Sequence, residues 1–145
     1  MVNEVQAVAA KLGGTRVFGR TLSSDGDMRE AIRGGFPPAV VENLMRASGL
    51  TLRELAGALD LSPRSLQRRR LSGKLARYES DRLYRLARLV AIATEYLGDS
   101  ERAKRWLRRP NRALGGLEPL SAVDTEAGVR QVENLLGRIA YGGIS

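Results

Sequence analysis

Apolar residues recur every three to four positions along most of the chain, which is the spacing of one face of a helix. The clearest stripe lies within residues 80–97. It consists of Leu83, Leu86, Ala87, Val90, Thr94 and Leu97. No segment alternates apolar and polar residues as a half-buried strand does. The sequence therefore predicts an all-α fold.

Glycine and proline divide the first part of the chain. Residues 1–27 begin with helical apolar spacing and continue into a loop rich in Gly, Ser and Asp. A short helix is expected from Asp27 until a Gly-Gly-Phe-Pro-Pro sequence interrupts it. Proline fits a first helical turn, so the next helix should begin at Pro37-Pro38 and stop at Gly49. Its expected buried residues are Val40, Val41, Leu44 and Met45.

Two short helices are predicted next. Thr51 and Glu54 have the spacing of a capping box, which starts the first helix. Ser62 as N-cap and Pro63 at the first helical position start the second, which ends near Leu71. Two such helices joined by three or four residues are typical of a helix-turn-helix. The expected packing residues are Leu52, Leu55, Ala56, Leu59 and Leu66.

The last third should contain two helices separated by a loop. The first spans about 99–107, with Trp106 and Leu107 expected as core anchors because an aromatic-poor chain gains by burying its one Trp. The final helix spans about 125–141. It is expected to bury Val129, Val132, Leu136 and Ile139.

The loop between them is interpreted as a structural corner that aims the final helix. Pro110 stops the preceding helix, and Asn111 can satisfy local backbone groups. Gly115-Gly116 permits positive φ or close backbone approach. We expect three segments in all: residues 1–27, partly loop; a helix-turn-helix domain over 28–98; and a small helical domain over 99–145.

Charge is unevenly distributed. Residues 46–112 hold 17 of the 24 Lys and Arg residues and 7 of the 16 Asp and Glu residues, a net charge of +10. The rest of the chain carries −2. A basic centre of this kind fits a polyanion-binding protein, although a solvated arginine-rich surface would have the same composition.

Composition also narrows the chemistry. The chain has neither Cys nor His, so it lacks thiol nucleophiles, the commonest zinc ligands and the usual acid–base side chain. We expect no enzymatic activity, no metal and no cofactor. No apolar run approaches a membrane span of about 20 residues, and the N-terminus lacks the pattern of a signal peptide. We expect a cytoplasmic protein without membrane contact.

The second helix of the predicted helix-turn-helix carries the candidate DNA-binding residues. They are Arg64, Ser65, Gln67, Arg68 and Arg69. Arg can pair with guanine and Gln with adenine through two hydrogen bonds, each worth about 1–3 kcal/mol of discrimination. Two positions depart from the common pattern: Asp60 where the turn usually has Gly, and Arg69 where an apolar residue is usual. Because Arg68, Arg69 and Arg70 fan around the helix, at least one must serve a phosphate, a carboxylate or a partner protein.

The combined motifs resemble the Xre/MbcA/ParS family of bacterial type II antitoxins. The first motif is Leu-Ser-Pro-Arg-x-Leu-Gln-Arg over 61–68. The second is a long, ordered set of C-terminal residues. It comprises Trp106, Leu107, Pro110, Asn111, Ala113, Leu114, Gly115, Gly116, Pro119, Leu120, Thr125, Gly128, Val132, Leu136, Arg138, Ile139 and Gly142. The resemblance covers about residues 28–143.

This resemblance implies a partner protein. Antitoxins of this family are encoded beside RES-domain toxins, which degrade NAD⁺, and occlude the toxin's active site with their C-terminal region. They also bind their own promoter as repressors through the helix-turn-helix. A dimer, or a higher hetero-oligomer with toxin, is expected because a helix-turn-helix reads two half-sites.

The candidate toxin-binding residues lie at the end of the final helix: Arg138, Ile139, Tyr141 and Gly142. Arg138 could reach into the toxin or could complement the helix dipole, and the sequence favours neither. Two other functions remain open. The chain could be a stand-alone transcriptional regulator with a C-terminal dimerisation domain, or an inhibitor whose arginines face the toxin rather than DNA.

Overall fold

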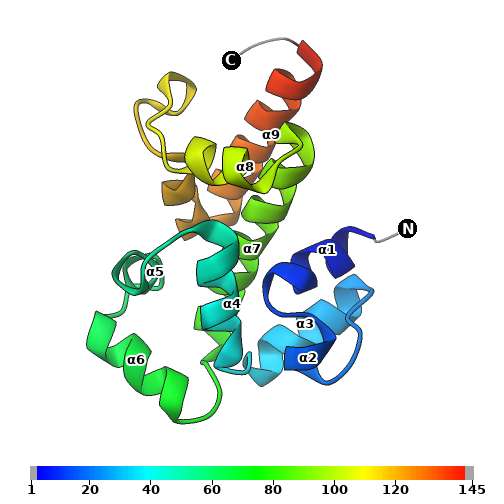
Figure 1. Ribbon diagram of the computed structural model, residues 1–145, viewed down its shortest axis with the longest axis vertical. Helices are drawn as coiled ribbons and strands as arrows, with labels where there is room; N and C mark the ends of the chain where they lie inside the picture. Colours follow the sequence, from blue (N-terminus) through cyan, green and yellow to red (C-terminus); the bar gives the residue numbers. More distant parts are fainter. Residues whose placement is uncertain (1–2, 143–145) are drawn as a thin grey trace. The chain divides into compact units, whose positions relative to one another are not determined.

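The computed structural model describes residues 3–142, and its regular elements are all helices (Figure 1). The predicted all-α fold is confirmed. The α-helices are α1 (Glu4–Lys11), α2 (Thr15–Phe18), α3 (Asp25–Gly34), α4 (Ala39–Ser48), α5 (Leu52–Ala58), α6 (Pro63–Leu71), α7 (Arg77–Leu97), α8 (Ser100–Leu107) and α9 (Glu126–Gly142). Two 3₁₀ turns, η1 (Arg112–Leu114) and η2 (Pro119–Asp124), lie between α8 and α9.

The chain divides into two compact units, Met1–Ala87 and Arg88–Ser145. This division falls inside α7, whereas the sequence placed a domain boundary after residue 98. Gly98, with φ of 78°, does end the helix. A helix stop is a local backbone signal, however, and does not mark which parts of the chain pack together. One continuous helix therefore contributes to both units.

The N-terminal segment is more ordered than its composition indicated. Helix α1 packs against α4, and α2 lies where the sequence predicted loop. The Phe18 ring at the end of α2 packs edge-on against the buried ring of Phe36, with centroids 5.4 Å apart. A four-residue helix has no periodicity to detect, so this contact was not visible in the sequence.

Helix α3 begins two residues before the predicted start, because Ser24 is its N-cap. The Ser24 hydroxyl accepts from the Asp27 N–H, and the Asp27 carboxylate accepts from the N–H groups of Ser23 and Ser24. These backbone hydrogen bonds, with Arg20 nearby, hold the pKa of Asp27 below its usual range. Side chain and backbone therefore fix the start of α3 together.

The start of α7 is tied to the segment before α4. The Leu75 N–H donates to the Phe36 carbonyl at 3.0 Å, and the Phe36 N–H donates to the buried Ser80 hydroxyl at 2.8 Å. Gly35 lies beside them with φ of 84°, and a Cβ there would stand 2.3 Å from the Leu75 carbonyl oxygen. Only glycine fits this close approach. As predicted, α4 buries Val40, Val41 and Leu44, while Met45 is only half-buried.

In the second unit, η2 packs against both α8 and α9. The Arg88 guanidinium on α7 donates to Glu126 at 2.6 Å and to Glu133 at 2.9 Å, so one arginine holds two turns of α9. Gly128 allows the first turn of α9 to approach η2, because a Cβ would lie 2.4 Å from the Ala122 carbonyl oxygen. The buried residues of α9 are Val129, Val132, Leu135 and Leu136.

Candidate functional site

The turn between α5 and α6 has the geometry of a helix-turn-helix. Asp60 has φ of 60° and is the only non-glycine residue with positive φ among residues 3–142. The following Leu61 N–H donates to the Ala56 carbonyl at 2.9 Å. Asp takes the left-handed conformation more readily than most residues, so it replaces the usual glycine here. Ala56, one of the expected packing residues, is fully buried.

The predicted caps of both helices are confirmed. Thr51 and Glu54 form the capping box of α5. At the start of α6, the Ser62 hydroxyl oxygen accepts from the Ser65 N–H at 3.0 Å. Leu66 is fully buried, which fixes the face of α6 that turns away from solvent.

The opposite face of α6 carries three of the candidate DNA-binding residues. Arg64, Gln67 and Arg68 are exposed, and their spacing of three and four residues places them on one side of the helix. The Gln67 side-chain oxygen accepts from Arg70 at 3.0 Å. Ser65 is half-buried, and its hydroxyl accepts from the Ser62 hydroxyl at 3.0 Å. The exposed start of α6 is therefore polar, basic and presented as one surface.

Arg69 has a different environment. Its Nε lies 2.8 Å from Oε2 of Glu79, whose side chain is completely buried. The contact is an ion pair without hydrogen-bond geometry, because the distance is short but neither atom has a hydrogen-bond partner. The other Glu79 oxygen accepts from the Ala76 N–H at 2.8 Å. One of the three consecutive arginines thus binds a carboxylate, as expected from their different directions around the helix, and this contact joins α6 to α7.

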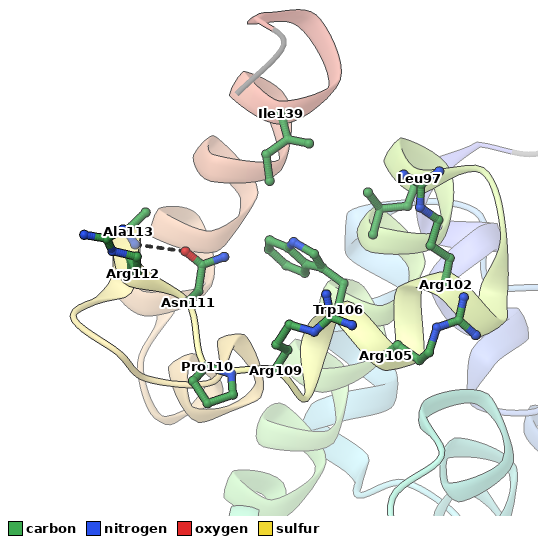
Figure 2. A pocket seen from close by; sticks show the side chains of 10 residues that line it. All are labelled: Leu97, Arg102, Arg105, Trp106, Arg109, Pro110, Asn111, Arg112, Ala113 and Ile139. Carbon is green, nitrogen blue, oxygen red and sulfur yellow. Dashed lines mark hydrogen bonds between the residues drawn. The ribbon is translucent and has the colours of Figure 1, made fainter. Parts of the chain in front are cut away.

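The second unit contains an open pocket of about 550 Å³ (Figure 2). Its walls come from the end of α7, from α8, from the loop around η1 and from the end of α9. The lining residues are Leu97, Arg102, Arg105, Trp106, Arg109, Pro110, Asn111, Arg112, Ala113 and Ile139. Four of the ten are arginines and none is acidic, so the pocket presents positive charge around an apolar interior.

The position of Trp106 differs from the one predicted from the sequence. We expected it to anchor the core with Leu107, but only Leu107 is fully buried. Trp106 is half-buried, and its indole points into the middle of the pocket (Figure 2). The sequence did not signal this difference, because Trp106 lies three residues after the buried Ala103 and so close to the same side of the helix.

The loop before α9 is built as a corner, as predicted. The Asn111 side chain accepts from the Ala113 N–H at 2.9 Å, and the Asn111 carbonyl accepts from the Gly116 N–H at 2.9 Å. Gly115 and Gly116 have φ of 68° and 89°. These bonds close the loop on itself and hold Asn111 at the pocket wall.

The four candidate toxin-binding residues lie near the end of α9 in different environments. Ile139, expected to be buried, is half-buried and lines the pocket. Tyr141 is 84% exposed and packs edge-on against Tyr96 of α7, with ring centroids 5.8 Å apart. Arg138 and Gly142 are exposed. The last turn of α9 contains no basic residue, so Arg138 lies too far back for a large helix-dipole interaction.

A metal site or a membrane-spanning helix would also bear on function in the part of the chain that the structure describes. Over residues 3–142, no three acidic side chains gather closely enough to hold a metal ion. Over the same residues, no helix is both long and apolar enough to cross a lipid bilayer.

Comparison with known proteins distinguishes two regions of the chain. Residues 27–88 match the antitoxin Xre-like helix-turn-helix domain, and residues 93–142 match the antitoxin Xre/MbcA/ParS C-terminal toxin-binding domain. Antitoxin Xre of Photorhabdus laumondii is 33% identical over 90% of this chain and 89% of its own length. Antitoxin Xre of Pseudomonas putida is 35% identical over 83% of this chain and 76% of its own. With both family domains present in order, and relatives that match along most of their length, the chain belongs to the Xre/MbcA/ParS family of antitoxins.

Proposed function

We propose that this protein neutralises a RES-domain toxin that degrades NAD⁺, and that it represses its own operon in the cytoplasm. The observation that carries the proposal is the match of residues 93–142 to a toxin-binding domain. The structure of that domain supports it, because the end of α9 leaves Arg138, Tyr141 and Gly142 exposed beside a basic pocket. The end of α9 would enter the toxin's active site and exclude NAD⁺.

Repression would use the exposed face of α6. Arg64, Gln67 and Arg68 are exposed, and the Gln67 side chain is bonded to Arg70 of the same helix; all three could therefore enter a major groove. Arg69 is committed to Glu79 and would position α6 rather than read bases. Two copies would bind two half-sites about 34–36 Å apart, either as a homodimer or within a larger complex with toxin.

The first test is co-expression with the adjacent reading frame of the genome, purified through a tag on that second protein. We expect a stable complex in which NAD⁺ consumption is silent. The matched variant ends at Gly137 and so keeps the buried residues of α9 but lacks Arg138 to Ser145. It should lose neutralisation and retain operator binding, since the helix-turn-helix lies in the other unit.

Three outcomes would count against the proposal. If the tagged partner purifies alone, the chain is better described as a stand-alone regulator with a C-terminal dimerisation domain. If the complex forms but the partner does not consume NAD⁺ when released, the toxin class is wrong. If the shortened chain still rescues growth, residues 138–145 are not the inhibitory element.

A further inference from the structure

Helix α8 separates two sets of residues. Ala103 and Leu107 are fully buried on one face. Arg102, Arg105 and Trp106 turn to the pocket, and Arg109 continues their spacing past the end of the helix. Residues at these intervals share one side of a helix. The sequence of α8 therefore builds a basic wall with one half-buried tryptophan in it, and that wall faces the pocket.

The charge of this wall is not compensated within the protein. Lys104, on the same helix, pairs with Glu101 at 2.9 Å. Among residues 3–142, no carboxylate pairs with Arg102, Arg105 or Arg109, nor with Arg112 across the pocket. Several cations around one concave site raise the local positive potential and attract an anionic partner.

The interior of the pocket is apolar rather than only charged. The Trp106 indole lies in its middle, with Ile139 facing it from α9 and Pro110 and Ala113 on the loop side (Figure 2). Trp and Arg are the residues most enriched at the energetic centres of protein interfaces. An arginine fork also fits a carboxylate in a bidentate arrangement. The pocket thus suits a side chain that is apolar at its tip and flanked by carboxylates.

We infer that this pocket is a docking site for an acidic segment of the toxin that inserts one aromatic or aliphatic side chain against Trp106. The inference rests on the proposed function and adds the chemistry of the contact. Continuity supports it, because Ile139 belongs both to the pocket and to the end of α9 that would enter the toxin. DNA fits less well, since phosphate contacts need no apolar cavity between the arginines.

Two charge reversals test the inference, Arg105→Glu and Arg109→Glu. Both side chains are exposed, so the fold should tolerate them. Each should weaken toxin binding by at least about tenfold, since like charges now face each other across the interface. Arg130→Glu is the control: it lies on α9, is exposed and is not part of the pocket. It should change toxin affinity less than twofold, and operator affinity should be the same for all three variants.

The occupant can be identified by photocrosslinking from p-benzoylphenylalanine placed at position 106. The crosslinked toxin peptide should contain at least two Asp or Glu residues beside an apolar one. If both charge-reversal variants bind the toxin as tightly as the wild type, the pocket is not a docking site, although the antitoxin function stands. Loss of operator binding instead would assign the wall to DNA, and a crosslink to a second copy would assign it to self-association. If the wild-type chain binds no toxin, the proposed function fails and the docking site fails with it.

Discussion

Neighbouring arginines on α6 have different surroundings, and the difference decides what each can do. Arg64 and Arg68 point to solvent, where the side chain is free to meet a base edge or a phosphate. Arg69 faces a buried carboxylate 2.8 Å away. Removing a solvent-facing arginine should therefore change binding, whereas removing the paired one should change the fold around it.

At the residue scale, Arg64→Ala and Arg68→Ala should each weaken operator binding by about 10–100-fold per half-site, the range expected for one lost specific contact. Toxin neutralisation should be unchanged. Arg29→Ala and Arg33→Ala on α3 are matched controls, because they remove the same charge from exposed positions on a helix other than α5 and α6. Fluorescence anisotropy with the promoter fragment would measure this. Unchanged affinity in both α6 variants would show that α6 is not the recognition helix.

At the scale of elements, Glu79 links the recognition helix to the helix that follows. One oxygen caps the start of α7 at Ala76, and the other pairs with Arg69 of α6. The carboxylate is fully buried, so removing it leaves the Ala76 N–H without its cap and the Arg69 guanidinium without its counter-charge. The orphaned backbone group is the costly one, because the Arg69 side chain is 38% exposed and solvent screens its charge.

We expect Glu79→Ala to lower the free energy of unfolding by about 1–3 kcal/mol, mainly from the lost cap and the unpaired Ala76 N–H, since Arg69 is partly exposed. Glu30→Ala should cost no more than about 0.5 kcal/mol, since that carboxylate is exposed and its ion pair weak. Urea denaturation would compare them. A double-mutant cycle with Arg69→Ala then isolates the pair, and a coupling near zero would mean that Glu79 acts through its cap alone.

At the scale of the whole molecule, the net charge of +8 hides a basic centre. Part of this charge is used internally: Arg85 pairs with Asp81, and Arg88 with Glu126 and Glu133. What remains is concentrated on α6 and around the pocket beside α8. These two surfaces lie in different units, so each can be tested without changing the other.

Operator binding should accordingly fall steeply with salt. If Arg64 and Arg68 of two copies each displace a counterion, the logarithm of the binding constant should fall with the logarithm of the salt concentration with a slope of about −4. Affinity should then drop by about two orders of magnitude between 50 and 200 mM salt. Removing Arg68 should reduce the slope by about two for the dimer. A salt-independent affinity would contradict phosphate contact by these arginines.

The sequence by itself determined the longer helices and several of their ends, but not the four-residue α2. Caps such as Thr51 with Glu54, and Ser62 with Pro63, are hydrogen bonds and ring constraints within a few residues, so the local sequence specifies them completely. The order of motifs was also enough to indicate the family, because recognising a motif requires only the spacing of its residues along the chain and not their contacts in the fold.

Only the tertiary structure decided which side chains remain available for function. It selected Arg69 among three adjacent arginines for the pair with Glu79, and it left Trp106 and Ile139 facing an open pocket rather than the core. These outcomes depend on residues brought together from separate helices. A periodic pattern shows that a helix has an apolar face, but the packing of its neighbours determines how much of that face is covered.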